Sequence, residues 1–433
     1  MAERLLLRCR DIPDLCRLDV YRQHGGYEAV QQALTRHRPE ELVEMVKASN
    51  LRGRGGAGFP TGMKWSFLPK QDTKPVYLCV NGDESEPGTF KDREIMEDDP
   101  HQLLEGVIIS AYAIKCHTAY IYIRGELLTA CQRMDEAIAE TRQAGLIGRN
   151  VLGTGFDLEV YVHRGAGAYI CGEETGLIES LEGKRAYPRI KPPFPAVYGL
   201  FGCPTIVINV ETLACVPHIV LRGADWFRAI GPEKSPGPKL FCVSGHVARP
   251  GTYELPMGTP LREIIYEHAG GIPNGRRLKG VIPGGASMPV FTPEEIDVPM
   301  DMDSVQKAGS FLGSAGIMVM DDTVCMVETT MILARFFHHE SCGQCTPCRE
   351  GTGWLHNVLE KLEHGSAKPS DVDLLLNIAG NVMGNTICAL ADAAAMPVRA
   401  FVTKYRAEFE QHAALGRCPF RPAGEEPRAH AQG

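Results

Sequence analysis

Four cysteines have the spacing of a metal centre. Cys342, Cys345 and Cys348 are separated by two residues each, and Cys388 follows further along the chain. A turning backbone can direct such closely spaced thiols into one cavity, where they suit a soft metal centre. A 4Fe-4S cluster, a structural zinc ion and a redox thiol pair all fit this pattern. Zinc sites usually take their ligands from two CxxC-type pairs, and the second pair is missing here, so we expect the iron–sulfur cluster.

The fourth ligand of this cluster is ambiguous from spacing alone. Cys418 precedes a proline, as the last cysteine of bacterial ferredoxin motifs does, but it lies at the edge of a polar tail that we expect to be disordered. Cys388 lies in the apolar segment 386–390, which can exclude water from a cofactor. We therefore prefer Cys388, and we interpret His338 and His339 as ordinary histidines rather than substitute ligands.

A glycine-rich loop is the second chemical feature. Gly53, Gly55 and Gly58 fit the pattern GxGxxG, but the residues before them, from Pro39 to Val46, are predicted to form a helix. The dinucleotide-binding fingerprint follows a strand, so we do not expect the standard fingerprint here. Backbone amides without side chains can still approach an anion closely, and Arg54 or Lys64 can add positive charge. A flexible surface loop is the alternative interpretation.

Three further loops combine glycine with carboxylates. They span residues 81–88, 124–126 and 163–174. Carboxylates accept hydrogen bonds from ribose hydroxyls and flavin amide groups, and they repel the extra 2'-phosphate of NADP, so the composition favours NAD. Any one of these runs alone would be better explained as a solvated acidic turn.

The elements that must position these loops alternate between strand and helix. Apolar runs at 76–80, 119–123 and 158–162 predict strands, and helical periodicity begins at Pro100 and near Leu127. This βαβαβ order predicts a parallel sheet covered by helices. The three acidic loops then meet where the carboxyl ends of the strands open, which is the usual ligand site of such a sheet.

Breakers and changes of periodicity divide the chain into three expected domains. Residues 1–237 form the α/β domain, which ends in a linker rich in glycine and proline. Residues 238–323 contain a hairpin, a helix and two more strands, an α+β domain for which we expect a scaffolding role. Residues 324–433 are helical, with the three-cysteine motif in a loop between helices and a disordered C-terminal tail.

Composition excludes several classes of protein. The net charge of -8 argues against nucleic-acid binding, and fifteen cysteines without a dense framework indicate a reducing compartment. The first residues lack the apolar run of a signal peptide. The most apolar stretch, 103–123, is broken by Lys115 and His117, so we expect no direct membrane insertion and assign any membrane attachment to partners.

Five motifs together resemble one family, the NADH-binding flavoprotein subunit of respiratory complex I. They lie at 51–66, 83–88, 167–174, 191–195 and 340–349, in the family's order. The resemblance spans about residue 20 to 410. It implies a Rossmann-like FMN and NADH domain, a ubiquitin-like (β-grasp) middle domain and a C-terminal helical bundle that carries a 4Fe-4S cluster.

The resemblance also implies roles for individual residues. No protein group is required as a catalytic acid or base, and Glu86 and Glu174 position NADH. FMN is held by Gly53, Arg54, Gly55, Gly56, Ala57, Gly58, Lys64, Asn81, Asp83, Glu84, Tyr169, Gly172, Glu173, Asn209 and Thr212; NADH lies against Phe59, Phe67, Glu86, Glu174 and Phe194; the cluster ligands are Cys342, Cys345, Cys348 and Cys388. One departure is Ile208, where the family usually has an asparagine near the FMN phosphate.

The function implied by the resemblance is electron input to the respiratory chain. A hydride passes from NADH to FMN, and single electrons leave through the 4Fe-4S cluster towards quinone. The implied partners are a small thioredoxin-like 2Fe-2S subunit and a large iron–sulfur subunit of the peripheral arm. The implied location is the cytoplasmic side of the bacterial inner membrane, or the mitochondrial matrix side in a eukaryote.

Two alternatives remain open at this point. Diaphorase subunits of NAD-linked hydrogenases and formate dehydrogenases share these motifs. A zinc-stabilised binding protein without redox turnover would explain the cysteines, but it would leave the glycine and acidic loops without a role.

Overall fold

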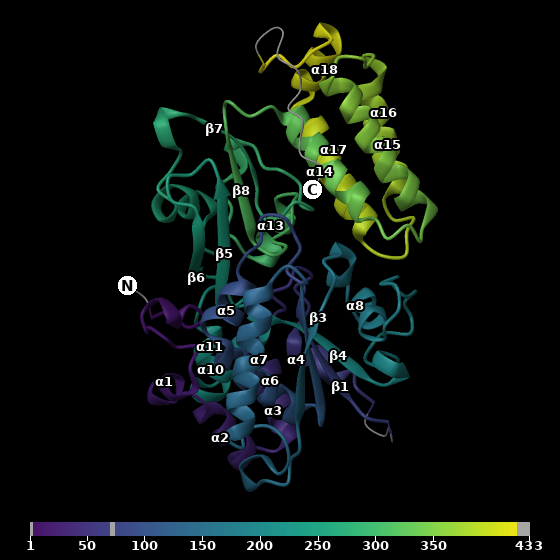
Figure 1. The fold of residues 1–433 in the computed structure, drawn as a ribbon. Helices are drawn as coiled ribbons and strands as arrows, with labels where there is room; N and C mark the ends of the chain where they lie inside the picture. The colour runs from purple at the N-terminus through teal and green to yellow at the C-terminus, as the bar shows by residue number, and fades with distance from the viewer. Residues whose placement is uncertain (1–2, 70–73, 422–433) are drawn as a thin grey trace.

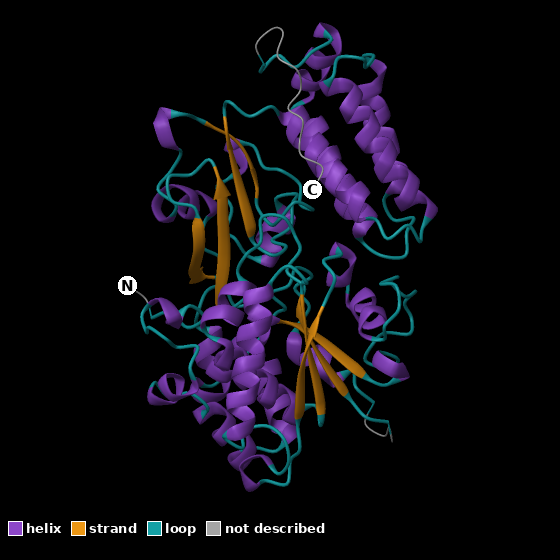
Figure 2. Cartoon of the chain, in the orientation of Figure 1, coloured by secondary structure: helices purple, strands orange, loops and turns teal. Residues whose placement is uncertain are grey.

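The computed structural model describes residues 3–69 and 74–421. Figures 1 and 2 show three parts: a parallel sheet packed against many helices, a second smaller sheet, and a helical bundle. The two sheets lie end to end, and the bundle packs beside the second sheet. This arrangement confirms the predicted fold class of an α/β part followed by an α+β part and a bundle.

The first sheet has the predicted parallel strands and one more. Its strands are β1 (Tyr77–Gly82), β2 (Thr118–Ile123), β3 (Glu159–Arg164) and β4 (Thr205–Asn209), in the order β3-β2-β1-β4. All neighbours are parallel, and the register places Asn81 beside Asn209. Strand β4 was not among the predicted strands, although its apolar run is a signal for a buried strand.

Helix α6 (Pro100–Ala113) begins where the sequence predicted a helix. The Asp99 side chain caps it by accepting a hydrogen bond from the Gln102 amide, and Pro100 occupies its first turn. Almost every residue of α6 is buried, because the helix is sandwiched between the sheet and outer helices. The other helices of this part are α1 (Leu18–Gln23), α2 (Glu28–Arg36), α3 (Pro39–Ala48), α4 (Thr61–Ser66), α5 (Asp92–Asp98), α7 (Leu128–Gln143), α8 (Glu174–Leu181), α9 (Val210–Ala214), α10 (Val216–Arg222) and α11 (Ala224–Arg228).

The glycine-rich loop connects α3 to α4, so it leaves a helix as expected. Its ends are joined by a hydrogen bond of 2.9 Å from the Gly53 amide to the Phe59 carbonyl. Short 3-10 turns elsewhere occupy Arg8–Arg10, Val151–Gly153, Tyr169–Gly172, Leu200–Gly202, Pro273–Gly275 and Pro293–Glu295.

The second sheet has the strand order of a β-grasp domain. Its strands are β5 (Pro238–Gly245), β6 (Gly251–Pro256), β7 (Leu278–Ile282) and β8 (Gly316–Asp321), in the order β6-β5-β8-β7. The central pair β5 and β8 is parallel, and each outer strand is antiparallel to its neighbour. The predicted helix after β6 is present as α12 (Leu261–Glu263), which continues as a π-helix over Ile264–His268; α13 (Met302–Lys307) precedes β8.

Five helices form the bundle around a core of their own. They are α14 (Met326–Glu340), α15 (Thr346–Glu363), α16 (Ser370–Val382), α17 (Leu390–Lys404) and α18 (Arg406–Leu415). Cys342 and Cys345 lie in the connection from α14 to α15, and Cys348 lies in the first turn of α15. Within the described residues, the structure contains no helix long and apolar enough to cross a bilayer.

Hydrogen bonds between the three parts fix their arrangement. The Glu254 carboxylate on β6 accepts bonds of 2.7 to 3.1 Å from the amides of residues 5–7 in the first part. Lys279 on β7 forms an ion pair of 2.8 Å with Glu408 of α18, and Tyr405 donates to the Lys279 carbonyl. These contacts join the β-grasp part to the first part on one side and to the bundle on the other.

Candidate functional site

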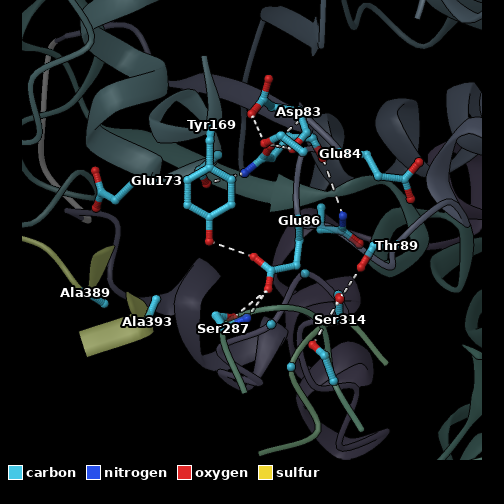
Figure 3. A pocket seen from close by; sticks show the side chains of 18 of the residues that line it. Asp83, Glu84, Glu86, Thr89, Tyr169, Glu173, Ser287, Ser314, Ala389 and Ala393 are labelled. Carbon is cyan, nitrogen blue, oxygen red and sulfur yellow. Dashed lines mark hydrogen bonds between the residues drawn. The ribbon is translucent and has the colours of Figure 1, made fainter. Parts of the chain in front are cut away.

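A cavity of about 310 Å³ lies at the carboxyl edge of the first sheet, where the three parts meet (Figure 3). Its volume is in the range of small-molecule binding sites. The first part contributes Gly55, Gly56, Asn81, Asp83, Glu84, Ser85, Glu86, Thr89, Lys91, Asp92, Tyr169, Ile170, Gly172, Glu173 and Asn209; the β-grasp part contributes Gly284, Ser287, Met288, Gly313 and Ser314; the bundle contributes Cys388, Ala389, Leu390, Ala393 and Met396.

Asparagines at the ends of β1 and β4 organise the cavity floor. The Asn81 side chain donates a hydrogen bond of 2.9 Å to the Gly172 carbonyl and accepts one of 3.1 Å from the Asp83 amide. Asn209, its neighbour in the register, donates 2.7 Å to the Asp92 carboxylate and caps α9. The parallel sheet therefore determines which loops face the cavity.

The glycine loop approaches the floor with its backbone. A side-chain Cβ at Gly55 would lie 3.0 Å from Cβ of Asn209, which is tighter than nine in ten such contacts, so glycine favours this close approach. Gly56 also lines the cavity, and its φ of +133° is a conformation that other residues rarely adopt. This stretch presents backbone amides, rather than side chains, to a ligand.

Arg54 does not face the cavity. It is fully buried, and its guanidinium donates 2.6 Å to the Pro236 carbonyl. Its amide donates 2.8 Å to the hydroxyl of Thr212. Arg54 and Thr212, both predicted to bind FMN, therefore support the shape of the glycine loop from behind.

Asp83 presents an unsatisfied acceptor. Its Oδ2 accepts 2.8 Å from the Ser85 hydroxyl, whereas Oδ1 is buried without a hydrogen-bond partner among the described residues. Burial raises the pKa of Asp83 to about 7. Flavin rings carry an imide N–H and amide-type groups, so a buried acceptor beside a glycine cradle fits FMN.

The neighbouring Glu84 points away from Asp83 (Figure 3). It accepts 2.7 Å from the Asp92 amide and 3.2 Å from Nε of Arg93, at the start of α5. Burial, followed by the charge of Asp92, raises the pKa of Glu84 to about 7. Glu84 therefore anchors α5 against the cavity.

Glu86 joins two parts of the molecule. Its carboxylate accepts 2.6 Å from the Tyr169 hydroxyl, 2.8 Å from the Ser287 amide and 2.6 Å from the Ser287 hydroxyl (Figure 3). Burial raises the pKa of Glu86. The side chain is thus held in one orientation at the boundary between the α/β part and the β-grasp part.

A buried ion network lies beneath the cavity. Lys91, which lines the wall, pairs at 2.7 Å with Asp92 and at 2.8 Å with Glu211, and Lys239 pairs with Glu211 at 2.7 Å. Burial would raise the pKa of Glu211, but the positive charges of Lys239 and Lys91 outweigh the effect of burial and lower this pKa to about 2. Burial lowers the pKa of Lys239 to about 8.

The cysteine motif lies against the bundle wall of the cavity. The Ser341 hydroxyl is 3.2 Å from Sγ of Cys348, and the Ile387 amide donates 3.4 Å to Sγ of Cys345. Burial first, and then the nearby Cys342 and Cys348, raise the pKa of Cys388 to about 12. Cys388 therefore lies beside the motif, and it also lines the cavity.

Cys418, His338 and His339 do not contact the cysteine motif in this structure. Sγ of Cys418 is 3.7 Å from Sγ of Cys325, at a different site in the bundle. His338 stacks on His356, with ring centroids 6.2 Å apart, and His339 pairs with Glu340. Of the candidates that spacing left open, the structure brings Cys388 to the motif.

Comparisons with known proteins agree with this geometry. Residues 46–218 match the family described as Nuo51 FMN-binding domain, residues 240–291 match the SLBB domain, and residues 328–412 match the NADH-ubiquinone oxidoreductase-F iron-sulfur binding region. An F-type subunit of the NADH-quinone oxidoreductase of Rhizobium meliloti is 60% identical, over 97% of this chain and 100% of the relative.

The chain belongs to the family of F-type subunits of NADH-quinone oxidoreductase. The F-type subunit of Mycobacterium bovis is 53% identical over 95% of this chain and 94% of its own length. The family matches confirm the expected cofactors, FMN and a 4Fe-4S cluster. They also confirm the resemblance to the flavoprotein subunit of complex I.

A related fold occurs in another enzyme class. The crystal structure of an NAD+-reducing NiFe hydrogenase in the H2-reduced state aligns with a TM-score of 0.83 at 36% identity. The alignment covers 95% of this chain and 66% of the hydrogenase chain. The fold of this family is therefore shared with a longer hydrogenase chain.

Half of the predicted cofactor residues do not line the cavity. Phe59 and Phe67 are about half exposed, with ring centroids 5.8 Å apart, and Phe194 is exposed as well. Lys64 pairs with Glu174 at 2.8 Å. The predicted residues outside the wall are Gly53, Arg54, Ala57, Gly58, Phe59, Lys64, Phe67, Glu174, Phe194 and Thr212.

The walls made by the other two parts were not predicted from the sequence. The β-grasp part was expected to be a scaffold, yet its Ser287 and Ser314 reach the cavity. The Gly284-Gly285 and Gly313 positions were a usable signal, because glycine often marks a close backbone approach. Nothing in the pattern indicated that Ala389 and Ala393 of the bundle would close the third side.

Ile208 does not line the cavity either. Its side chain is buried in the hydrophobic core beneath the sheet, together with Val80, its neighbour on β1. The departure from the family's usual asparagine therefore places an apolar side chain in an apolar environment.

Proposed function

We propose that this chain is the electron-input subunit of an NADH-quinone oxidoreductase, which oxidises NADH and passes electrons singly to its iron–sulfur cluster. One observation carries the proposal: Cys388 lines the cavity, and the amide of its neighbour Ile387 donates a hydrogen bond of 3.4 Å to Sγ of Cys345 in the cysteine motif. A ligand in the cavity is thus in contact with a residue of the cluster site. Bound FMN would accept the hydride and release its two electrons one at a time.

We assign FMN binding to the cavity floor and its walls. The amides of Gly55 and Gly56 can approach an anionic or ring group closely, and Oδ1 of Asp83 can accept a hydrogen bond from the flavin. Asn81 and Asn209 hold these loops in register. The remaining predicted FMN residues, Gly53, Arg54, Ala57, Gly58, Lys64, Glu84, Tyr169, Gly172, Glu173 and Thr212, are proposed to bind or support the same group.

NADH is proposed to enter beside the exposed aromatic rings. Phe59, in the glycine loop, lies against Phe67, and Phe194 is exposed as well, so these three rings offer apolar surfaces for stacking. Burial would raise the pKa of Glu174, but Lys64 and Lys191 outweigh the effect of burial and lower this pKa to about 2. The Glu174 carboxylate is therefore charged at neutral pH. The charged carboxylate of Glu174 favours NADH over NADPH, and Glu86 is proposed to position NADH together with it.

Cys342, Cys345, Cys348 and Cys388 are proposed to ligate the 4Fe-4S cluster. Their thiols come from the α14–α15 connection, the first turn of α15 and the residue before the turn into α17. Among the described residues, they do not close to within 4.8 Å of one another as ligands of a single ion would. This wider spacing suits a cluster of four irons better than one zinc ion.

The domain boundaries and the assembly complete the proposal. We place the FMN and NADH domain at 1–237, the β-grasp domain at 238–323 and the 4Fe-4S domain at 324–433. The chain would work in a peripheral arm with a thioredoxin-like 2Fe-2S subunit and a large iron–sulfur subunit. We propose the cytoplasmic face of a bacterial inner membrane as its location.

Reduction of ferricyanide by NADH tests the function directly. The purified chain loaded with FMN and iron–sulfur cluster should reduce ferricyanide, and NADH should bleach its flavin and cluster absorbance. A loaded chain that leaves both absorbances unchanged would overturn the proposal. Zinc without iron or flavin in the purified chain would instead favour a binding protein.

A hydrogenase diaphorase is the second candidate, and the structural alignment at a TM-score of 0.83 favours it. The two functions differ in what the chain assembles with. Affinity purification from the native host should recover iron–sulfur subunits of a quinone reductase; recovery of a NiFe subunit would decide for the hydrogenase.

A further inference from the structure

Four side chains that the proposed function does not use meet inside the bundle. They are Cys325 at the start of α14, Glu363 at the end of α15, His412 in α18 and Cys418 just after α18. All four are buried, and one possible ligand atom of each lies within 4.8 Å of those of the other three. Two thiols, an imidazole and a carboxylate are the ligand types that zinc prefers.

We propose that these four residues bind a single zinc-type divalent ion as a closed structural site. The separations are 3.7 Å between the two Sγ atoms, 3.3 Å from Cys325 Sγ to His412 Nε2, and 3.7 Å from Cys325 Sγ to Glu363 Oε2. A tetrahedron built from zinc bonds of about 2.3 Å to sulfur and about 2.0 Å to nitrogen or oxygen has edges of about 3.3 to 3.8 Å. These separations, with 3.5 Å from His412 Nε2 to Glu363 Oε2, match edges of such a tetrahedron, and one ligand atom of each residue lies within 4.8 Å of the others.

The histidine is oriented as a metal ligand. Nδ1 of His412 is 2.8 Å from the Glu408 carbonyl, which can only accept, so Nδ1 carries the proton. The lone pair of Nε2 then faces the cluster. A second ring nitrogen bonded to a backbone carbonyl is the usual support of a zinc-bound histidine.

A cation would also satisfy the contact between His412 and Glu363. Nε2 of the neutral ring and Oε2 of the carboxylate are both acceptors, yet they face each other at 3.5 Å in a buried site. This distance is longer than an N–H···O hydrogen bond, so a second ring proton does not join them well. The thiol of Cys325 can donate to only one of the two acceptors. An ion between the donors satisfies both.

A positive charge lies beside the proposed ion site. Two thiolates and one carboxylate around a divalent ion leave one negative charge. Arg421 lies 2.9 Å from the outer oxygen, Oε1, of Glu363 and 2.7 Å from Glu328. The guanidinium thus places positive charge beside the site, shared with Glu328, while Oε2 of Glu363 remains directed inward.

The site is separate from the iron–sulfur motif. Helix α15 contributes to both, but Cys348 lies in the first turn of this helix and Glu363 is its last residue. At about 1.5 Å per helical residue the two positions are roughly 22 Å apart. Figure 1 shows α18 at the far end of the bundle from the α14–α15 connection. The ion would therefore not share ligands with the cluster.

The proposed ion would connect the first helix of the bundle to the end of the described chain. The segment after α18 is also attached to the β-grasp part, because Lys279 lies 4.1 Å from the centre of the Phe420 ring. Binding of an ion to ligands from three helices and this segment would stabilise the closed bundle. Its role is structural, since all four protein ligands leave no open position.

Zinc content and zinc X-ray absorption of the loaded, full-length chain test the site. After purification in buffer with Zn²⁺ and dialysis against metal-free buffer, we expect one zinc per chain in addition to the iron. The zinc absorption edge is separate from that of iron, and it should show two sulfur ligands at about 2.3 Å and two nitrogen or oxygen ligands at about 2.0 to 2.2 Å. A chain that retains no zinc, or zinc with four sulfur ligands, would overturn the proposal.

Cys418→Ser is the variant of choice because Cys418 lies outside the helices. We expect zinc retention against a chelator to fall at least tenfold while the iron content is unchanged. Cys203→Ser, in the first part of the chain, is the matched control and should retain zinc. Zinc retained equally by both variants would contradict the site, and so would a Cys325–Cys418 disulfide in the wild type purified with Zn²⁺ present. If Cys418→Ser does not fold, the absorption spectrum of the wild type decides.

Discussion

The hydroxyl of Tyr169 donates a hydrogen bond of 2.6 Å to Oε2 of Glu86. Tyr169 lies in the turn before α8, and Glu86 follows β1, so the bond joins two loops at the carboxyl edge of the sheet. Ser287 of the β-grasp part holds the other oxygen of the same carboxylate. One residue thus fixes the relative position of three segments around the cavity.

Removing this hydroxyl should loosen Glu86. In Tyr169→Phe the buried carboxylate loses a donor, and bonds to charged groups contribute about 1.5 to 3 kcal/mol. We expect a lower melting temperature and a reduced kcat/KM for NADH. Tyr161→Phe, which alters an exposed tyrosine on β3, should change neither measurement. Equal activity of the two variants would show that the Glu86 orientation does not matter.

Asp83 should make the flavin-free chain less stable as the pH rises. Its folded pKa, about 7, lies above the ordinary value of 3.8. Between these values the folded chain binds more protons than the unfolded chain, so stability falls with increasing pH. The shift corresponds to no more than about 4 kcal/mol.

Urea unfolding of flavin-depleted chain at pH 5 and pH 8 measures this dependence. Asp83→Asn should reduce the slope, leaving the part that Glu84 contributes, and should also weaken FMN binding, since the amide replaces an acceptor that faces the cavity. The control is Asp225→Asn, at an exposed aspartate of α11, which should preserve the slope. A slope unchanged by Asp83→Asn would assign the titration to another group.

A side chain at Gly56 should reduce flavin affinity more than it reduces stability. A Cβ there meets no atom within 4 Å, and the position lines the cavity. Gly183 is a matched control because it also has positive φ and no neighbour within 4 Å, but it lies away from the wall. Both Gly→Ala changes should cost about 1 kcal/mol of stability from backbone strain.

Only Gly56→Ala should weaken FMN binding, by tenfold or more, in a fluorescence titration of the apoprotein. Similar affinities of the two alanine variants would show that the loop does not contact the flavin.

Cys388 and Cys418 should differ in the metal that they hold. Cys388→Ser should abolish the brown absorbance and lower the iron content, because the thiol lies beside Cys342 and Cys348. Cys418→Ser should preserve the absorbance, because this thiol contacts Cys325 instead. Iron analysis and the visible spectrum test both variants. Loss of iron in Cys418→Ser but not in Cys388→Ser would assign Cys418, rather than Cys388, as the fourth cluster ligand.

Ile208→Asn should destabilise the chain without improving FMN binding. The new amide would be buried in the core beneath β4 without a partner, which costs about 1 to 3 kcal/mol. Thermal unfolding and equilibrium FMN titration measure the two effects, and Ile206→Val on the same strand provides a mild apolar control. A gain in FMN affinity would show that the asparagine reaches the ligand.

Much of the fold follows from local patterns. The alternation of apolar runs and helical periodicity predicted β1 to β3, α6 and α7, and the breakers predicted the start of β5. β4 was missed because its short apolar run lies outside the strand and helix alternation. The π-helical end of the helix after β6 was missed as well, because its backbone geometry is decided by packing against the sheet.

The sequence by itself determined the chemistry that is available. The spacing of Cys342, Cys345 and Cys348, the glycine loop and the acidic loops are local features, and side-chain type and spacing are sufficient to recognise them. Only the tertiary structure decided which of them meet. It brought Cys388 to the motif and Cys418 to Cys325, and it closed the cavity with Ser287 and Ala393. These pairings join segments far apart in the chain, and packing of the three parts, rather than any local pattern, selects them.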